Sequence, residues 1–150
     1  MKIFAVLLVG LLLSSGVAWG GNYTDNLNGT VTDNVSGLVW QRLDDQTTRN
    51  WEAALTYCEN LTLASYTDWR LPNIKELEAL TDKTKYGPCV DEMAFPISYS
   101  QKATLNYWTS TTSTYVYKTD SAWDVSFQSG RTYCETKTYK RYVLCVRGGQ

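Results

Sequence analysis

The sequence contains no histidine among its 150 residues. This absence excludes Ser-His-Asp and Cys-His catalysis, histidine-based metal sites and a histidine pH switch. An excess of one charge is also missing, because 14 Lys and Arg residues oppose 15 Asp and Glu residues. A chain so close to neutrality lacks the concentrated positive field that general nucleic-acid binding needs. With 43% hydrophobic and 19% charged residues, the composition is nevertheless that of a folded domain.

A long hydrophobic run is present only at the start of the chain. Lys2 is followed by apolar residues from Ile3 to Leu13, a stretch shorter than the about 20 residues that span a membrane as a helix. Small residues come next, so residues 1–20 are predicted to be a signal peptide with cleavage after Ala18 or after Gly20. We therefore expect an exported protein, periplasmic or extracellular at the cell surface, without a membrane span after signal cleavage.

The remaining residues 21–150 have the length of one domain and contain all of the cysteines, Cys58, Cys89, Cys134 and Cys145. Four cysteines in a small exported domain indicate two disulfides, for which three pairings are possible. The cysteines do not form the close Cys-x-x-Cys pairs of a zinc site. The sequence therefore gives no reason to expect a metal or another cofactor.

Helical patterns occur in the first half of this domain. Asn50 can cap a helix in which apolar residues recur with helical spacing as far as Leu61, and Asn73 with Glu76 has the capping-box pattern of a second helix. Short β-type segments precede these helices, and longer ones fill residues 107–146. Helices that cluster before most of the strands indicate an α+β fold.

The candidate binding residues come from the β-rich second half. Tyrosine is frequent, with 11 residues against 3 phenylalanines. Tyrosines suit a surface that contacts a polar partner, and cross-strand packing explains them equally well. A basic run near the C-terminal end could bind a polyanion or simply protect a strand edge. From these patterns the candidate ligand-binding residues are Tyr115, Tyr117, Trp123, Arg131, Lys137, Tyr139, Lys140 and Arg141.

Four ordered blocks stand out along the chain. They occupy residues 25–40, 68–77, 107–111 and 145–149, and the second begins with Asp-Trp-Arg-Leu-Pro-Asn. In all four blocks the sequence resembles the Lcl C-terminal domain family, a family of exported bacterial domains. The resemblance covers nearly the whole mature chain.

This resemblance implies a fold related to C-type lectins and to formylglycine-generating enzymes. Such a fold has two helices packed on small twisted antiparallel sheets, with long loops on one side. By the same similarity Cys58 pairs with Cys145, which leaves Cys89 and Cys134 for a second disulfide.

Several residues in or near the blocks have a simpler explanation than ligand binding. Arg70 could hold an anion, but a structural ion pair with Asp68 or Glu76 is the more economical interpretation. Tryptophans in apolar contexts are explained by core packing. The residues assigned to structure are therefore Trp40, Trp69, Arg70, Pro72, Glu76, Trp108 and Arg147.

The predicted function follows from export, the family resemblance and the lack of catalytic equipment. C-type lectins that bind sugars through calcium carry a Glu-Pro-Asn or Gln-Pro-Asp loop and a Trp-Asn-Asp strand, and this sequence has neither. We predict a non-catalytic binding or adhesion module for a glycan or extracellular polymer. A sulfated polysaccharide is one candidate, because collagen-like family members are associated with sulfated glycosaminoglycans. The alternatives are a cell-surface structural or assembly component that binds a protein, and a thiol or redox enzyme related to formylglycine-generating enzymes.

Overall fold

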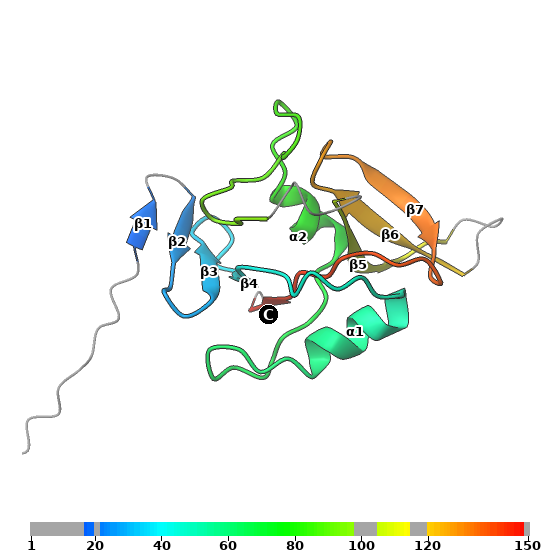
Figure 1. Cartoon of the computed structure of the whole chain (residues 1–150), viewed down its shortest axis with the longest axis horizontal. Coiled ribbons are helices and arrows are strands. Elements are labelled where there is room, and N and C mark those ends of the chain that lie inside the picture. The colour runs from blue at the N-terminus through cyan, green and yellow to red at the C-terminus, as the bar shows by residue number, and fades with distance from the viewer. Residues whose placement is uncertain (1–16, 20–21, 98–104, 115–119, 149–150) are drawn as a thin grey trace, which may run out of the picture.

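The computed structural model describes residues 17–19, 22–97, 105–114 and 120–148. Within these residues the chain forms two helices and eight strands, and the strands form two antiparallel sheets. The predicted α+β class is therefore confirmed. The two sheets lie towards opposite ends of the longest axis, with helix α2 (Ile74–Ala79) between them and helix α1 (Trp51–Glu59) below (Figure 1).

The first sheet brings the two ends of the domain together. Its strands, in spatial order, are β1 (Val17–Trp19), β2 (Tyr23–Asp25), β3 (Thr30–Asp33), β4 (Val39–Gln41) and β8 (Val146–Arg147). The C-terminal strand β8 pairs antiparallel with β4, so the last block of the sequence lies beside the first. Strand β1 belongs to the segment predicted to be the signal peptide and pairs with β2.

Both helices begin where the sequence predicts them. Helix α1 (Trp51–Glu59) starts at Asn50, whose side chain accepts a hydrogen bond from the Ala53 backbone N–H. Helix α2 (Ile74–Ala79) starts at Asn73 with both hydrogen bonds of a capping box. Each helix buries only its inward stripe. Among the described residues, neither helix has the length and apolar character needed to cross a bilayer.

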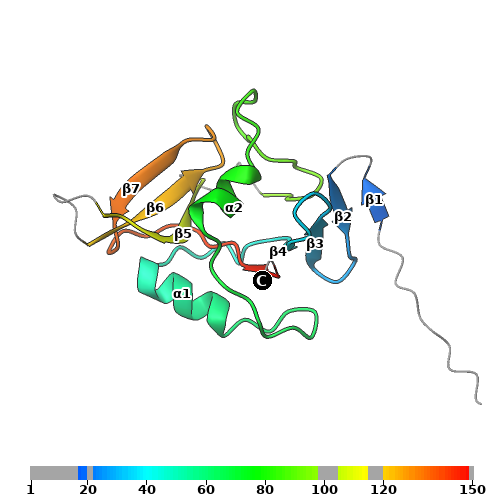
Figure 2. The same ribbon diagram turned by 180° about the vertical axis from the view of Figure 1, so that it is seen from behind.

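The second sheet consists of β5 (Asn106–Thr112), β6 (Ser121–Ser126) and β7 (Thr132–Thr136), paired in that order. One of its faces carries Tyr107 and Val125 into the core cluster that contains Leu77 of α2. The opposite face carries Trp108 and Ala122 into a second cluster with α1. Figure 2 shows this sheet from behind, with β7 as its outer strand. The part of this second face that lies beyond Trp108 is left for polar side chains.

The tryptophans of the sequence blocks contribute to the core. Trp40 and Trp108 are almost fully buried, and Trp69 packs in the second cluster. The indole N–H of Trp108 donates to the Arg49 carbonyl at 2.9 Å, which satisfies its polar atom inside the core. The carbonyl of Pro72 accepts a hydrogen bond from the Ser110 backbone N–H at 2.8 Å. The blocks therefore pack against one another.

One disulfide is present among the described residues, between Cys58 of α1 and Cys145 just before β8. It has the pairing that the family resemblance implied. The prediction of a second disulfide between Cys89 and Cys134 is wrong, because both residues are thiols in this structure. The Cys89 backbone N–H bonds to the Phe127 carbonyl, whereas Cys134 pairs in register with Trp123, four residues earlier. That offset is about 13 Å along the strand, and a disulfide needs Cα atoms within about 7 Å.

Candidate functional site

An open groove with a volume of about 820 Å³ lies against the polar face of the second sheet. We call it the β7 groove. It is lined by residues 83–86 from the loop after α2, by the β6–β7 turn and by side chains of the sheet. The sheet residues are Asn106, Ser126, Tyr133, Glu135 and, from the following segment, Arg141.

The register of the strands explains why these side chains share one face. Asn106 pairs with Ser126, and Tyr133 pairs with Asp124. Directly opposed residues of an antiparallel pair point to the same side of a sheet. The groove therefore receives alternate residues of three strands, and the residues between them face the core around α2.

The 83–86 loop is held against the β6–β7 turn by backbone contacts. The Gly87 N–H donates to the Gln128 carbonyl at 2.9 Å, and the Cys89 thiol donates to the carbonyls of Lys85 and Gln128 at 2.9 and 3.1 Å. Gly130 has φ +67°, and a Cβ there would lie 3.3 Å from Cγ of Lys83. The turn therefore favours glycine, and a side chain there would press on the stem of Lys83.

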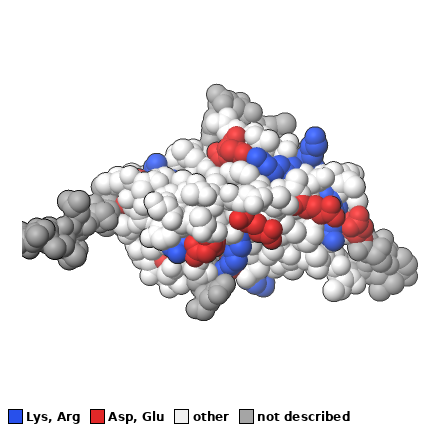
Figure 3. Space-filling view, turned by 90° about the horizontal axis from the view of Figure 1, so that it is seen from below, with Lys and Arg blue, Asp and Glu red and all other residues white. Residues whose placement is uncertain are grey.

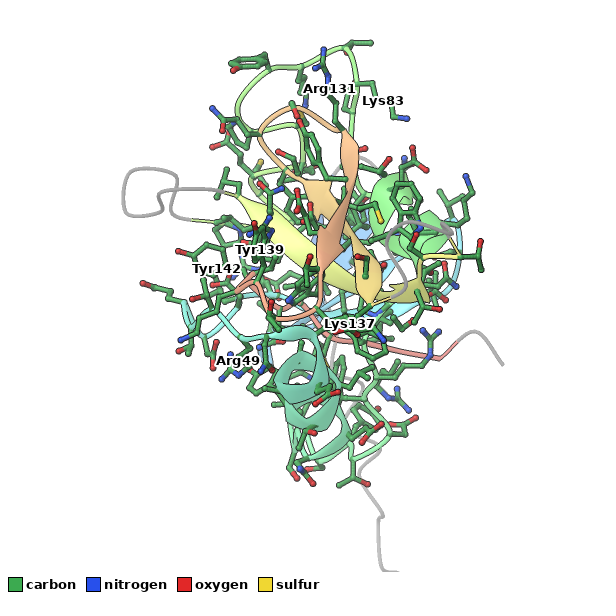
Figure 4. All side chains as sticks on the ribbon, turned by 90° about the vertical axis from the view of Figure 1, so that its right-hand side faces the viewer. Arg49, Lys83, Arg131, Lys137, Tyr139 and Tyr142 are labelled. Carbon is green, nitrogen blue, oxygen red and sulfur yellow. A yellow bond between two sulfur atoms is a disulfide. The ribbon has the colours of Figure 1, made fainter. Side chains whose placement is uncertain are left out.

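Two cations lie side by side at this end of the groove (Figure 4). Lys83 is paired with Glu78, at 2.6 Å between Nζ and Oε1. Arg131 is exposed and makes no ion pair with any residue that the structure describes. Lys85 also lines the groove and lies 3.8 Å from an Asp82 oxygen. Arg131 is thus the groove cation whose guanidinium has no competing carboxylate.

Arg141 is held in place by a buried carboxylate. Its Nε donates to Asp124 at 2.8 Å, and the Asn106 amide donates to the other Asp124 oxygen at 2.7 Å. Burial raises the pKa of Asp124 and outweighs the opposing effect of these two hydrogen bonds. The Arg141 guanidinium also lies 5.5 Å from the Tyr139 ring centre and 5.8 Å from that of Trp108. The charge of Arg141 is therefore largely taken up by contacts within the protein.

The structure separates Arg131 from the basic run that the sequence places near it, which consists of Lys137, Lys140, Arg141 and Arg147. Arg131 and Lys137 stand just outside the two ends of β7, about 20 Å apart at strand spacing. Lys137 lies over the Trp51 ring at 4.4 Å and 3.6 Å from an Asp120 oxygen. Lys140 is exposed and does not line the groove.

The predicted aromatic residues also divide. Trp123 is half-buried on the face opposite Tyr133, because the register pairs Tyr133 with its neighbour Asp124. Tyr139 is exposed, and the Arg141 guanidinium lies over its ring (Figure 4). Tyr115 and Tyr117 lie outside the described residues. The groove residues that sequence reasoning missed include Lys83, Lys85 and Tyr86, and their only signal is a polar stretch before Gly-Pro.

Elsewhere on the molecule, charges are mostly arranged as pairs of opposite sign. On the face seen in Figure 3, acidic and basic side chains lie next to one another. Arg70 donates to both Glu76 oxygens at 2.8 and 2.7 Å, and Arg147 donates to both Asp68 oxygens at 2.7 and 3.0 Å. These two pairs link the second sequence block to α2 and to β8.

The four sequence blocks thus form one connected framework. A comparison with protein families matches the part of the chain that contains most of them. Residues 29–147 match the family described as the Lcl C-terminal domain. The chain belongs to the Lcl C-terminal domain family. A comparison with individually curated proteins gives no match. The β7 groove lies entirely within the matched segment of this Lcl C-terminal domain.

Proposed function

We propose that this Lcl C-terminal domain is an exported, non-catalytic binding module with a C-type-lectin-like fold, and that the β7 groove recognises a glycan or another extracellular polymer. The observation that carries the proposal is the combination of exposed rings and hydrogen-bonding groups in one groove. Tyr86 is 78% exposed and Tyr133 is 39% exposed, so both can stack on sugar rings. Asn106 and Gln128 add side-chain amides to the same lining.

The charges of the groove favour an acidic polymer such as a sulfated polysaccharide. Arg131 can offer two parallel N–H donors to a sulfate or carboxylate. Lys83 and Lys85 are more than half exposed in their ion pairs, and such pairs are weak enough to be exchanged for a ligand. The groove therefore combines a site for anionic groups with a site for ring stacking.

Two features bear on the alternative functions. A thiol enzyme needs a partly exposed thiolate; Cys89 is fully buried and donates to two carbonyls, so Cys134, which is half-buried, is the thiol that this alternative would have to use. A structural component that binds a protein is supported by exposed apolar side chains at turns of the first sheet. Leu27 is 66% exposed and Val35 is 75% exposed.

The test measures binding of the purified, oxidised protein to neutral and sulfated glycans at low and high salt, with and without EDTA. Arg131→Ser is expected to weaken binding to sulfated chains about tenfold, because charge-assisted hydrogen bonds are lost. Lys140→Ser removes the same charge outside the groove and is the matched control. Absence of binding across the panel, or equal losses in both variants, would count against the β7 groove and favour a protein partner. EDTA-sensitive binding would instead indicate a calcium site.

A further inference from the structure

A second hollow lies on the other sheet and shares no lining residue with the β7 groove. We call it the Tyr66 pocket, and its volume is about 210 Å³. Its main lining residues are Asn26, Asn28, Thr30, Thr32, Tyr66 and Arg147. At about 30 Å³ per water molecule, it has room for about seven waters, which is comparable with one sugar ring.

The floor of this pocket is a fixed array of amides and hydroxyls. The Asn26 amide donates to the hydroxyls of Thr30 and Thr32 at 2.9 and 3.0 Å. The Thr30 hydroxyl donates to the side-chain oxygen of Asn28 at 2.7 Å. The two N–H groups of the Asn28 amide have no partner among the described residues and remain for a ligand.

The wall of the pocket carries a charge that is already neutralised. The Arg147 guanidinium lies 3.6 Å from the Tyr66 ring centre and donates to both oxygens of Asp68. Tyr66 is still 42% exposed. The pocket therefore offers an aromatic surface and hydroxyl-binding groups without a net charge, which suits a neutral polyhydroxylated molecule.

The backbone next to several residues of the pocket is strained. Four described non-glycine residues have positive φ, and three of them lie within two positions in the sequence of a residue that lines this pocket. Leu27 (φ 56°) separates Asn26 from Asn28, while Ala64 and Ser65 (φ 53° and 66°) directly precede Tyr66. A left-handed conformation costs an L-residue about 1–2 kcal/mol. Such strain concentrates at ligand sites, and the side chain of Leu27 is too exposed to repay it by packing.

We propose that the Tyr66 pocket binds one neutral sugar residue. The apolar face of the sugar lies against Tyr66, and its hydroxyls bond to Asn28 and Thr32. The β7 groove plays no part in this binding, so each site can be tested without the other.

The test is a titration of the isotopically labelled protein with the neutral methyl glycosides of glucose, galactose, mannose and N-acetylglucosamine, followed by NMR. One of them is expected to shift the signals of the Asn28 side-chain amide, the Tyr66 backbone and the Arg147 Nε–H saturably. Signals of Arg131 and Tyr133 in the β7 groove should not move. Because the pocket carries no net charge, the dissociation constant should not change with salt, unlike binding of a polyanion.

Variants that replace a side chain by one of similar shape test whether the sugar binds in the Tyr66 pocket. Thr32→Val removes one hydroxyl from the pocket and should weaken binding about tenfold. Thr24→Val makes the same change at the cross-strand neighbour of Thr32, outside the pocket, and should leave the dissociation constant unchanged. Tyr66→Phe should retain binding, and Tyr66→Ala should lose it in a folded protein.

Three outcomes would overturn the proposal. They are no saturable shift with any of the glycosides, shifts confined to the β7 groove, and equal weakening by Thr24→Val and Thr32→Val. A wrong proposal for the β7 groove would give a different result. The protein would not bind sulfated glycans, but the titration of the Tyr66 pocket with neutral glycosides would still show saturable shifts.

Discussion

At the scale of single residues, one carboxylate joins three parts of the fold. Glu76 accepts hydrogen bonds from the Arg70 guanidinium and from the Asn73 backbone N–H at 2.8 Å. Arg70 in turn donates to the Gly148 carbonyl at 3.1 Å. The start of α2 is thereby linked to the end of β8, which explains why these residue types occur together in the sequence blocks.

Glu76→Gln is expected to lower the free energy of unfolding by about 2 kcal/mol, because charge-assisted bonds to Arg70 and the capping bond are weakened. Urea denaturation measures the loss. Glu78→Gln is the control on the same helix, since within the described part of the chain Glu78 pairs only with the exposed lysines Lys75 and Lys83. It should cost less than about 1 kcal/mol. Equal losses in the two variants would contradict this assignment.

The same bonds make stability depend on pH. Burial acts to raise the pKa of Glu76, but the hydrogen bonds from Arg70 and Asn73 outweigh it and hold the pKa below its ordinary value of 4.5. Because the folded pKa is the lower one, the stabilisation is complete above the unfolded pKa and is lost as pH falls through the folded pKa. The stability difference between wild type and Glu76→Gln should therefore shrink below about pH 4. A difference that stays constant in acid would refute this linkage.

The sequence could limit the partners of Arg70 but could not choose between them. Asp68 and Glu76 are both close in the chain. The structure assigns Glu76 to Arg70 and gives Asp68 to Arg147, which is 79 residues away. Local spacing cannot reveal a competitor brought in by a distant strand, because that contact depends on how β8 pairs with β4.

At the scale of elements, the turn from Leu63 to Tyr66 adopts a conformation that its residues disfavour. These two residues exchange backbone hydrogen bonds of 3.2 and 3.0 Å, and both residues between them have positive φ. Two successive left-handed residues form the type I′ pattern, which usually requires Asn-Gly. Ala64-Ser65 carries no such signal, so this turn could not be predicted from the sequence.

Ala64→Gly is expected to raise the free energy of unfolding by about 0.5–1 kcal/mol. Relief of the left-handed cost, about 1–2 kcal/mol, exceeds the added entropy of the unfolded chain. Ala53→Gly in α1 makes the same chemical change at helical φ and should destabilise by about 1 kcal/mol. The two denaturation midpoints should move in opposite directions. A loss of stability in Ala64→Gly would show that the surrounding packing favours the alanine.

Elements with local signals could be predicted well. Asn50 and Asn73 identify the starts of both helices because capping depends on residues within one turn. Strand β8 lies at the end of a longer apolar run, and only the tertiary pairing with Val39 and Trp40 limits it to two residues. The order of strands in the first sheet is likewise a long-range property.

At the scale of the whole molecule, the disulfide closes a loop with a sequence separation of 87. Replacing Cys58 and Cys145 together with Ser should lower the free energy of unfolding by about 2–5 kcal/mol, since a long loop regains its freedom when unfolded. Cys134→Ser is the control outside the disulfide and should cost less than about 1 kcal/mol. Similar losses of stability in the double variant and in Cys134→Ser would contradict the assignment of the disulfide to Cys58 and Cys145.

The same experiment has a chemical counterpart. Alkylation of the denatured but unreduced protein should modify Cys89 and Cys134 and leave Cys58 and Cys145 untouched. Mass spectrometry of the peptides identifies which residues react. Protection of Cys89 and Cys134 would mean that a second disulfide forms after all.

The β7 groove shows why a site is harder to predict than a fold. Arg131 was found from its position near the basic run and lines the groove, whereas Lys137, which belongs to the run, lies beyond the far end of β7. The opposite wall comes from residues 83–86, which reach the β6–β7 turn only through the contacts of Gly87 and Cys89. No local pattern encodes that meeting.

The Cys58–Cys145 bond also determines which part of the chain can be stretched. A pulling force applied before residue 58 and after residue 145 passes directly through the bond, so the segment between the two cysteines carries no tension. At about 3.5 Å per residue, this withholds about 300 Å of contour length from extension. The β7 groove lies wholly inside the shielded segment, whereas β2, β3 and β4 lie outside it. Under mechanical load the force therefore acts directly on β2, β3 and β4 and bypasses the segment that forms the β7 groove.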